Sequence, residues 1–127
     1  MNIADSAWMA GLFEGEGSIS ISKKKGYCYL QLVSTDEDVL YKFARLANCK
    51  NKITYCKRRP HQTKDHWKWQ VGNQADVTRL LEIMLPFLGD RRSAKANEVL
   101  TFYHDRDSRK QTAVITVGNL SQLGDKH

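Results

Sequence analysis

The chain of 127 residues is long enough for one domain with a single core and too short for two. Its composition, 41% hydrophobic and 27% charged, excludes a disordered chain, and its longest apolar runs fall far short of the roughly 20 residues that a membrane span needs. Lysine and arginine number 20 against 14 acids, and twelve of these bases lie in residues 23–73, so the middle of the chain suits a polyanionic partner.

The first half of the chain predicts a helix, a hairpin and a second helix. Asp5 or Ser6 is placed to cap a helix with apolar residues at helical spacing, and Gly17 allows a sharp turn into a strand. Strict alternation of serine and isoleucine, then three lysines and a glycine, predicts a strand and its turn. These elements are expected over residues 6–15, 18–33 and 36–48.

The second half predicts another hairpin and two more helices. Strands are expected from Lys52 to Arg58 and from His66 to Val71, around a basic loop. One helix begins at Asp76 and is closed by Pro86 and Gly89. The other runs from Arg91 to about His104. The predicted class is therefore α+β, in the order α-β-β-α-β-β-α-α with four antiparallel strands.

The sequence of the C-terminal tail does not predict one particular structure. We divide the chain into a domain of residues 1–105 and a tail of residues 106–127. The tail contains a short β-like run at residues 113–117 and could be an edge strand, a short helix near Leu120, or loosely ordered.

The two hairpins alternate between an apolar and a polar face. Trp67 and Trp69 fall with the apolar set, which favours a core position over stacking on bases. Lys23, Lys24 and Lys25 lie at a hairpin tip, where they could clamp phosphates or simply solubilise the turn; the position favours clamps. A polar, basic sheet face of this kind can lie in a DNA major groove, although it can equally be a solvated surface. Twelve side chains are the candidate DNA contacts: Ser20, Ser22, Lys23, Lys24, Lys25, Tyr29, Gln31, Thr54, Arg58, Arg59, Lys68 and Gln70.

The segment from Trp8 to Ile19, WMAGLFEGEGSI, combines small residues with two acids. Ala10, Gly11 and Gly15 allow another helix to approach closely. Glu14 and Glu16 fall at the end of the helix, where the dipole disfavours acids, so their presence suggests a compensating divalent cation. Taken alone, two acids beside a loop could also be ordinary surface residues.

This segment resembles the signature of the LAGLIDADG homing endonucleases, with Met9 for the first leucine, Phe13 for isoleucine, and Glu14 and Glu16 for the two aspartates. The order of elements and the later Leu85-Pro86-Phe87-Leu88 and Lys95-Ala96 extend the resemblance to residues 5–104. It implies a four-stranded DNA-binding saddle and a site-specific, double-strand DNA endonuclease. With one motif, the chain is expected to act as a homodimer on a pseudo-palindromic site.

The resemblance also implies the roles of site residues. Glu16 takes the place of the metal-binding acid, with Gly15 beside it, and Glu14 takes the place that more often supports the helix end. Arg91 and Arg92 compete for the place of a basic catalytic residue, because counting from Pro86 favours Arg91 and counting from Lys95 favours Arg92. Mg²⁺ is the expected cofactor, with Mn²⁺ able to substitute and Ca²⁺ binding without cleavage. The expected dimer contacts are Trp8, Ala10, Gly11, Phe13, Glu14 and Gly15.

Other interpretations remain. The same scaffold could serve as an intron RNA maturase or a DNA-binding protein that does not cleave, and a basic face could bind acidic proteins.

Cys28, Cys49 and Cys56 suit reduced thiols better than disulfides, and their spacing with His61 and His66 matches no common zinc pattern. The first fifteen residues contain no lysine or arginine, whereas a secretory signal begins with a basic segment. Together with the short apolar runs, this predicts a soluble, intracellular protein with no membrane partner. The expected location is the cytoplasm of a bacterium or a phage-infected cell, or an organelle.

Overall fold

The computed structural model describes the backbone of residues 1–126 and the side chains of residues 1–110. The order of elements confirms the predicted α-β-β-α-β-β-α-α, with a 3₁₀ turn before the last helix. The elements are α1 (Ile3–Glu16), β1 (Gly17–Ser22), β2 (Tyr27–Ser34), α2 (Glu37–Ala47), β3 (Thr54–Cys56), β4 (His66–Val71), α3 (Gln74–Met84), η1 (Leu85–Phe87) and α4 (Asp90–Lys126).

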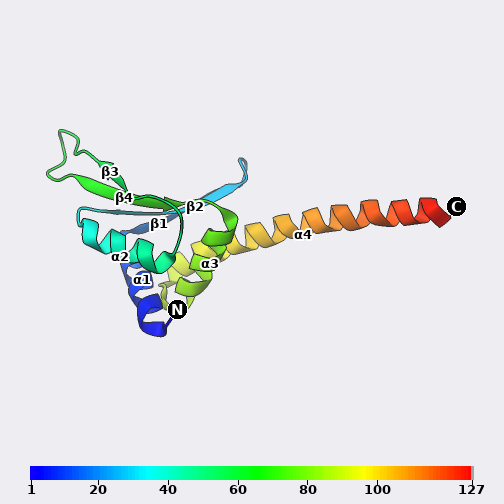
Figure 1. Ribbon diagram of the computed structural model, residues 1–127, viewed down its shortest axis with the longest axis horizontal. Helices are drawn as coiled ribbons and strands as arrows, with labels where there is room; N and C mark the ends of the chain where they lie inside the picture. Colours follow the sequence, from blue (N-terminus) through cyan, green and yellow to red (C-terminus); the bar gives the residue numbers. More distant parts are fainter. Residues whose placement is uncertain (127) are drawn as a thin grey trace.

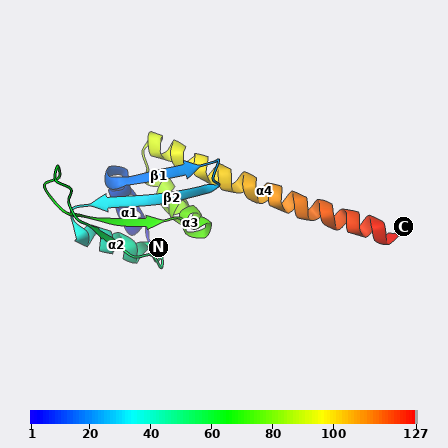
Figure 2. The ribbon, with the colours of Figure 1, turned by 90° about the horizontal axis from the view of Figure 1, so that it is seen from above.

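The four strands form one antiparallel sheet in the order β1-β2-β4-β3. Helices α1, α2 and α3 lie beneath the sheet (Figure 1), and α4 runs beside β1 (Figure 2). Because strand side chains alternate between faces, β1, β2 and β4 turn their apolar sets toward the helices and their polar sets toward the uncovered face, whereas Tyr55 of β3 stays exposed. Leu30, Leu32 and Trp69 are fully buried, as the alternation predicts.

Aromatic side chains join the helices to the sheet in the core. The rings of Phe13 on α1 and Phe43 on α2 stack with their centroids 6.5 Å apart. Phe43 in turn meets Trp69 on β4 edge to face at 4.9 Å. This arrangement confirms a core position for Trp69, and Trp67 is half-buried against the same cluster. The end of α1 is therefore held at a fixed place under the sheet.

Two helices begin earlier than predicted, because an asparagine upstream of the expected cap takes that role. The side chain of Asn2 accepts a hydrogen bond from the Asp5 N–H at 2.7 Å, so α1 begins at Ile3 rather than at residue 6. Asn73 caps α3 in the same way through the Asp76 N–H at 2.9 Å. The predicted caps Asp5 and Asp76 instead lie in the first turns, where acids favour the helix dipole.

Strand β3 is shorter than the predicted Lys52–Arg58 and covers only Thr54–Cys56. At one end the side chain of Asn51 donates to the Gln70 carbonyl at 2.8 Å. At the other end the Arg58 N–H donates to the Asp65 carboxylate at 2.8 Å, so it is not available to continue the strand. Side chains thus replace ladder hydrogen bonds at both ends of β3.

Helix α4 is much longer than predicted. It continues past His104 to Lys126 and covers the tail, which is therefore neither an edge strand nor a separate short helix at Leu120. No proline follows Pro86 in the sequence, so nothing sterically interrupts the helix. Its last turns extend well beyond the sheet (Figures 1 and 2). No helix in the described part of the chain is both long and apolar enough to cross a membrane.

Candidate functional site

The two acids at the end of α1 have different surroundings. The Glu14 carboxylate accepts hydrogen bonds from the Gly89 N–H at 2.6 Å and from Arg92 Nε at 3.0 Å. Arg92 Nε also lies 3.1 Å from the main-chain oxygen of Glu14. The protein itself therefore supplies the cation and N–H that compensate Glu14 at a helix C-terminus.

Glu16 has no such compensation. Its side chain is exposed and makes no hydrogen bond or ion pair with the side chains and backbone that the structure describes. It lines a hollow of about 620 Å³ between the end of α1, the end of β2 and the loop from β3 to β4. The other lining residues are Val33, Ser34, Thr35, His61, Gln62, Thr63, Lys64 and His66.

The hollow opens on the uncovered face of the sheet. Val33 lies opposite Lys68 in the register of β2 and β4, and His66 is two residues before Lys68, so all three belong to the polar face. Glu16 therefore stands at the end of the same face that carries the predicted DNA contacts. Thr35, to which the sequence assigns no catalytic role, lines this hollow as well.

The two candidate catalytic arginines are separated by their environments. Arg92 keeps only 16% of its side chain exposed and is engaged with Glu14, whereas Arg91 is exposed. Both line a second hollow of about 400 Å³ with Ser18 and Lys95, on the side of β1 that faces α4. Arg92 thus has a partner in Glu14, whereas Arg91 makes no ion pair with the described residues.

The residues suited to hold a divalent ion are few. No group of three or more His, Cys, Asp or Glu side chains able to hold a metal occurs in the described part of the chain. The Glu16 carboxylate, with the neighbouring Gly15 carbonyl, offers oxygen donors of the kind that Mg²⁺ prefers. Because Mg²⁺ keeps several of its waters, one free carboxylate fits such an ion without a complete protein cage.

The candidate DNA contacts on the strands share one face. Ser20 pairs with Tyr29, and Thr54 pairs with Lys68. Gln31 pairs with Gln70 across the centre of the sheet. The three lysines, Lys23, Lys24 and Lys25, are exposed at the β1–β2 turn, and Lys23 lies 3.6 Å from Glu98 of α4. The structure therefore brings the predicted set together on one surface, from the hollow at one end to the lysines at the other.

The loop of residues 57–65 is ordered by an acid that the sequence analysis did not single out. Asp65 accepts from the Tyr55 hydroxyl at 2.6 Å and from the Arg58 N–H. Both hydrogen bonds hold the pKa of Asp65 below its ordinary value, and the bond between Tyr55 and Asp65 also raises the pKa of Tyr55. Gln62 caps the turn by accepting from the Arg59 N–H at 2.8 Å. The loop thereby presents exposed Arg58 and Arg59, both predicted DNA contacts, in one conformation.

The predicted dimer contacts divide between two sides of α1. Trp8, Gly11 and Gly15 share one helical stripe; Trp8 is half-buried and both glycines are exposed, with no atom of the described residues within 4 Å of an added Cβ. Ala10 and Phe13 were predicted for the same interface, but both are fully buried in the chain's own core. They cannot contact a second copy without unfolding the first.

Gly17 is required for a reason other than the predicted sharp turn. Its φ of −91° is extended backbone that any residue adopts. A Cβ at this position would lie 2.5 Å from the Phe13 ring, which packs directly against the glycine. Gly17 therefore provides space for the core at the junction of α1 and β1.

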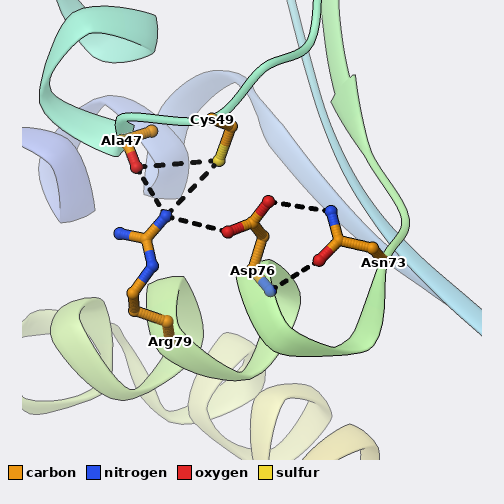
Figure 3. A network of polar contacts seen from close by, with 5 residues as sticks. All are labelled: Ala47, Cys49, Asn73, Asp76 and Arg79. Carbon is orange, nitrogen blue, oxygen red and sulfur yellow. Dashed lines mark hydrogen bonds and ion pairs between the residues drawn. The ribbon is translucent and has the colours of Figure 1, made fainter.

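A network of polar contacts joins α2 to α3 (Figure 3). Arg79 donates to the Ala47 carbonyl at the end of α2 at 2.7 Å and pairs with Asp76 at 3.1 Å. Asp76 is held in turn by Asn73. The hydrogen bonds from Asn73 and Arg79 lower the pKa of Asp76, and burial raises the pKa of the adjacent Cys49 thiol. This network ties together two of the helices that support the sheet.

Arg106 joins α4 to the far end of the sheet. Its guanidinium donates to the Gly26 carbonyl in the β1–β2 turn at 2.7 Å and also bonds the Gln74 side chain at the start of α3. The same guanidinium lies over the Tyr103 ring at 5.0 Å. The turn that carries the three lysines is therefore anchored from below.

Comparison with known families decides where this fold belongs. A family model described as a LAGLIDADG-like domain matches residues 4–84. The chain belongs to the LAGLIDADG-like family. The matched region runs from α1 to the end of α3, so Arg91 and Arg92 lie beyond it. No curated protein sequence matches the chain.

Solved structures show the LAGLIDADG fold over more of the chain. The homing endonuclease I-CvuI in complex with its target is 20% identical, with a TM-score of 0.59 over 79% of this chain and 68% of that chain. The group I intron-encoded homing endonuclease I-CeuI, complexed with DNA, is 14% identical with a TM-score of 0.62, covering 87% of this chain and 59% of that chain. I-LtrWI, a LAGLIDADG homing endonuclease bound to target DNA, is 19% identical with a TM-score of 0.56, covering 87% and 39%. The likeness at these identities is one of fold.

Proposed function

We propose that this protein is a site-specific DNA endonuclease that acts as a homodimer on a pseudo-palindromic double-stranded site and hydrolyses phosphodiester bonds with a divalent metal ion. One observation carries the proposal. Glu14 pairs with Arg92 and accepts from the Gly89 N–H, whereas Glu16 is an exposed carboxylate beside the uncovered sheet face and has no partner among the described residues. An acid that faces DNA weakens binding through like charge, so a protein that only binds has no use for Glu16.

The sheet supplies the surface for DNA. Its uncovered face carries Gln31, Lys68 and Gln70 at paired positions, and amide and ammonium groups are the donors that read base edges in the major groove. Arg58 and Arg59 lie near Glu16's end of the face and the lysine turn lies at the other, so both ends can contact phosphates. The named relatives were solved with DNA, which agrees with this use of the fold.

The exposed stripe of Trp8, Gly11 and Gly15 on α1 supports the homodimer. Gly11 and Gly15 allow the helix of a second copy to approach closely, and Trp8 beside them offers apolar area. Pairing through this stripe would bring two Glu16 carboxylates to a shared centre and arrange two sheets with two-fold symmetry. A two-fold protein then recognises a site with two related halves.

Glu16 and the Gly15 carbonyl are the groups that would hold the metal ion. Arg91, which is exposed and has no ion pair in the described part of the chain, would contact a neighbouring phosphate. When bound, Mg²⁺ or Mn²⁺ would activate water and neutralise the charge that develops on the phosphate. Ca²⁺ would bind the same oxygen ligands without supporting cleavage. Arg92, by contrast, holds Glu14 in place and so keeps the end of α1 fixed beneath the sheet.

The test is selection of cleaved sites from a randomised, near-palindromic DNA pool, performed with Mg²⁺ and, in parallel, with a chelator. We expect one pseudo-palindrome to be recovered only with metal. Enrichment without cut ends in both arms would show a DNA-binding protein that does not cleave. No enrichment of DNA would overturn the proposal and direct the search to intron RNA, which a maturase on this scaffold would bind.

A further inference from the structure

The hollow beside Glu16 contains a histidine from the second hairpin that the proposed mechanism does not use. We propose that His66 contacts the scissile phosphate, donating a hydrogen bond from its imidazole to a phosphate oxygen opposite Glu16. This proposal rests on the endonuclease function and adds a residue from β4 to the active site. Its basis is that Glu16 and His66 line the same 620 Å³ hollow on the uncovered sheet face.

His66 is better positioned for such a contact than the other basic groups of the hollow. It is the first residue of β4 and pairs with Cys56, so the sheet fixes its backbone, and its side chain is half-buried. His61 and Lys64 also line the hollow, but both are exposed residues of the loop. A group on a rigid strand holds its geometry more accurately than one on a loop.

The charges around the hollow suit an anion. Glu16 is its one acidic lining residue, and Lys64, His61 and His66 line the same hollow. A metal ion on that carboxylate would therefore leave these basic groups available to a phosphate. Asp65 is adjacent to His66 in the chain, but its carboxylate is occupied by Tyr55 and Arg58. The hydroxyls of Ser34, Thr35 and Thr63 add further donors to the hollow.

The contact should affect cleavage more than binding. Charge on the phosphate oxygens grows in the transition state, so a donor placed there contributes more to the rate than to the affinity of the uncleaved DNA. DNA affinity itself is set mainly by the many phosphate and base contacts along the sheet. The loss of one hydrogen bond to a charged group predicts a decrease of about tenfold or more in the cleavage rate of bound DNA.

The experiment uses the full chain and the DNA site recovered by selection. The variants are His66→Ala and His66→Gln, with His104→Gln as the control, because His104 is an exposed histidine of α4 outside the hollow. Single-turnover cleavage with Mg²⁺ is compared with DNA affinity measured without metal. In parallel, the imidazole signals of the wild-type protein are followed by NMR as metal-free DNA is added.

We expect both His66 variants to lose at least about tenfold in single-turnover rate with less than about threefold change in affinity, while His104→Gln matches the wild type. The His66 imidazole signals should move on DNA addition and those of His104 should not. Wild-type rates in both His66 variants, equal losses of rate and affinity, or an unmoved His66 signal would each overturn the inference. These outcomes leave the endonuclease function standing, whereas a wild-type protein that cuts no DNA overturns that function itself.

Discussion

Arg92 binds Glu14 twice, at the carboxylate (3.0 Å) and at the main-chain oxygen (3.1 Å), although 78 residues separate them in the sequence. This contact joins the end of α1 to the start of α4 and explains why one of two neighbouring acids is structural. Glu16, by contrast, makes no hydrogen bond or ion pair with the described residues.

Replacing Glu14 should therefore reduce stability. Glu14→Ala removes the carboxylate from the largely buried guanidinium of Arg92 and leaves it only the main-chain oxygen, which should lower the free energy of unfolding by about 1–3 kcal/mol. Glu16→Ala is the matched control and should change it by less than about 0.5 kcal/mol, because the side chain is exposed and unpaired among the described residues. Urea denaturation measures both; equal effects would contradict the division of roles.

Replacing Glu16 should instead remove activity. Glu16→Gln deletes the charge that would hold a divalent ion and keeps the size of the side chain, so cleavage should fall by at least about 100-fold. DNA affinity should be equal or slightly higher, because a repelling charge is gone. Gel-shift and cleavage assays on the selected site measure the two quantities, and undiminished cutting by the variant would remove Glu16 from the mechanism.

The α1 stripe can be tested by filling it. An added Cβ at Gly11 has no atom of the described residues within 4 Å, and leucine favours the helix, so Gly11→Leu should not destabilise the monomer. It would separate two paired helices and should raise the dimer dissociation constant at least about tenfold. Analytical ultracentrifugation gives the assembly state. Ala75→Leu, a similar change at an exposed position of α3, is the control; if both variants dimerise equally, the stripe is not the interface.

Asp65 should support DNA binding although it is negatively charged. Asp65→Asn removes one repelling charge, yet it weakens the hydrogen bonds that set the loop carrying Arg58 and Arg59. We expect DNA affinity to fall about fivefold, because the loop that carries the two arginines loses part of its order. Asp38→Asn, at an exposed acid of α2, removes the same charge and should raise affinity slightly. Higher affinity in both variants would mean that the loop does not depend on Asp65.

The network of Figure 3 predicts how stability responds to acid. Hydrogen bonds from Asn73 and Arg79 keep the pKa of Asp76 below its ordinary value of 3.8. A carboxyl whose pKa is lowered by folding stabilises the protein above its unfolded pKa, and that contribution is lost as the pH falls through the folded pKa. Asp76→Asn should therefore cost about 1 kcal/mol at pH 7, and its difference from the wild type should shrink below about pH 4. A difference that stays constant down to pH 2 in thermal unfolding would show that the charge contributes nothing.

The sheet and its two faces were predictable because their signal is local. Alternation along each strand assigns every side chain to a face, and Leu30 and Trp69 are buried as that pattern requires. The same periodicity places Lys68 and Gln70 on the uncovered face beside Gln31. These assignments depend only on neighbours two residues apart.

The partners of individual side chains were not predictable in this way. The spacing from Pro86 and from Lys95 did not decide which of Arg91 and Arg92 contacts Glu14, because that contact depends on how α4 packs against the end of α1. In the sequence, Asp65 is one of several polar residues in the loop of residues 57–65. Only the structure shows that it accepts hydrogen bonds from Tyr55 and Arg58. The burial of Ala10 and Phe13 likewise depends on which side of α1 faces the sheet.

Helix α4 has a consequence for the length of the DNA site. It carries Arg92, which fixes the end of α1, and Arg106, which fixes the far turn of the first hairpin. These arginines lie 14 residues apart on one helix, about 21 Å at 1.5 Å per residue. That length corresponds to about six base pairs of DNA at 3.4 Å each. In the proposed endonuclease, this one helix would therefore set the distance between Glu16 and the predicted lysine contacts, and with it the length of each half of the recognised sequence.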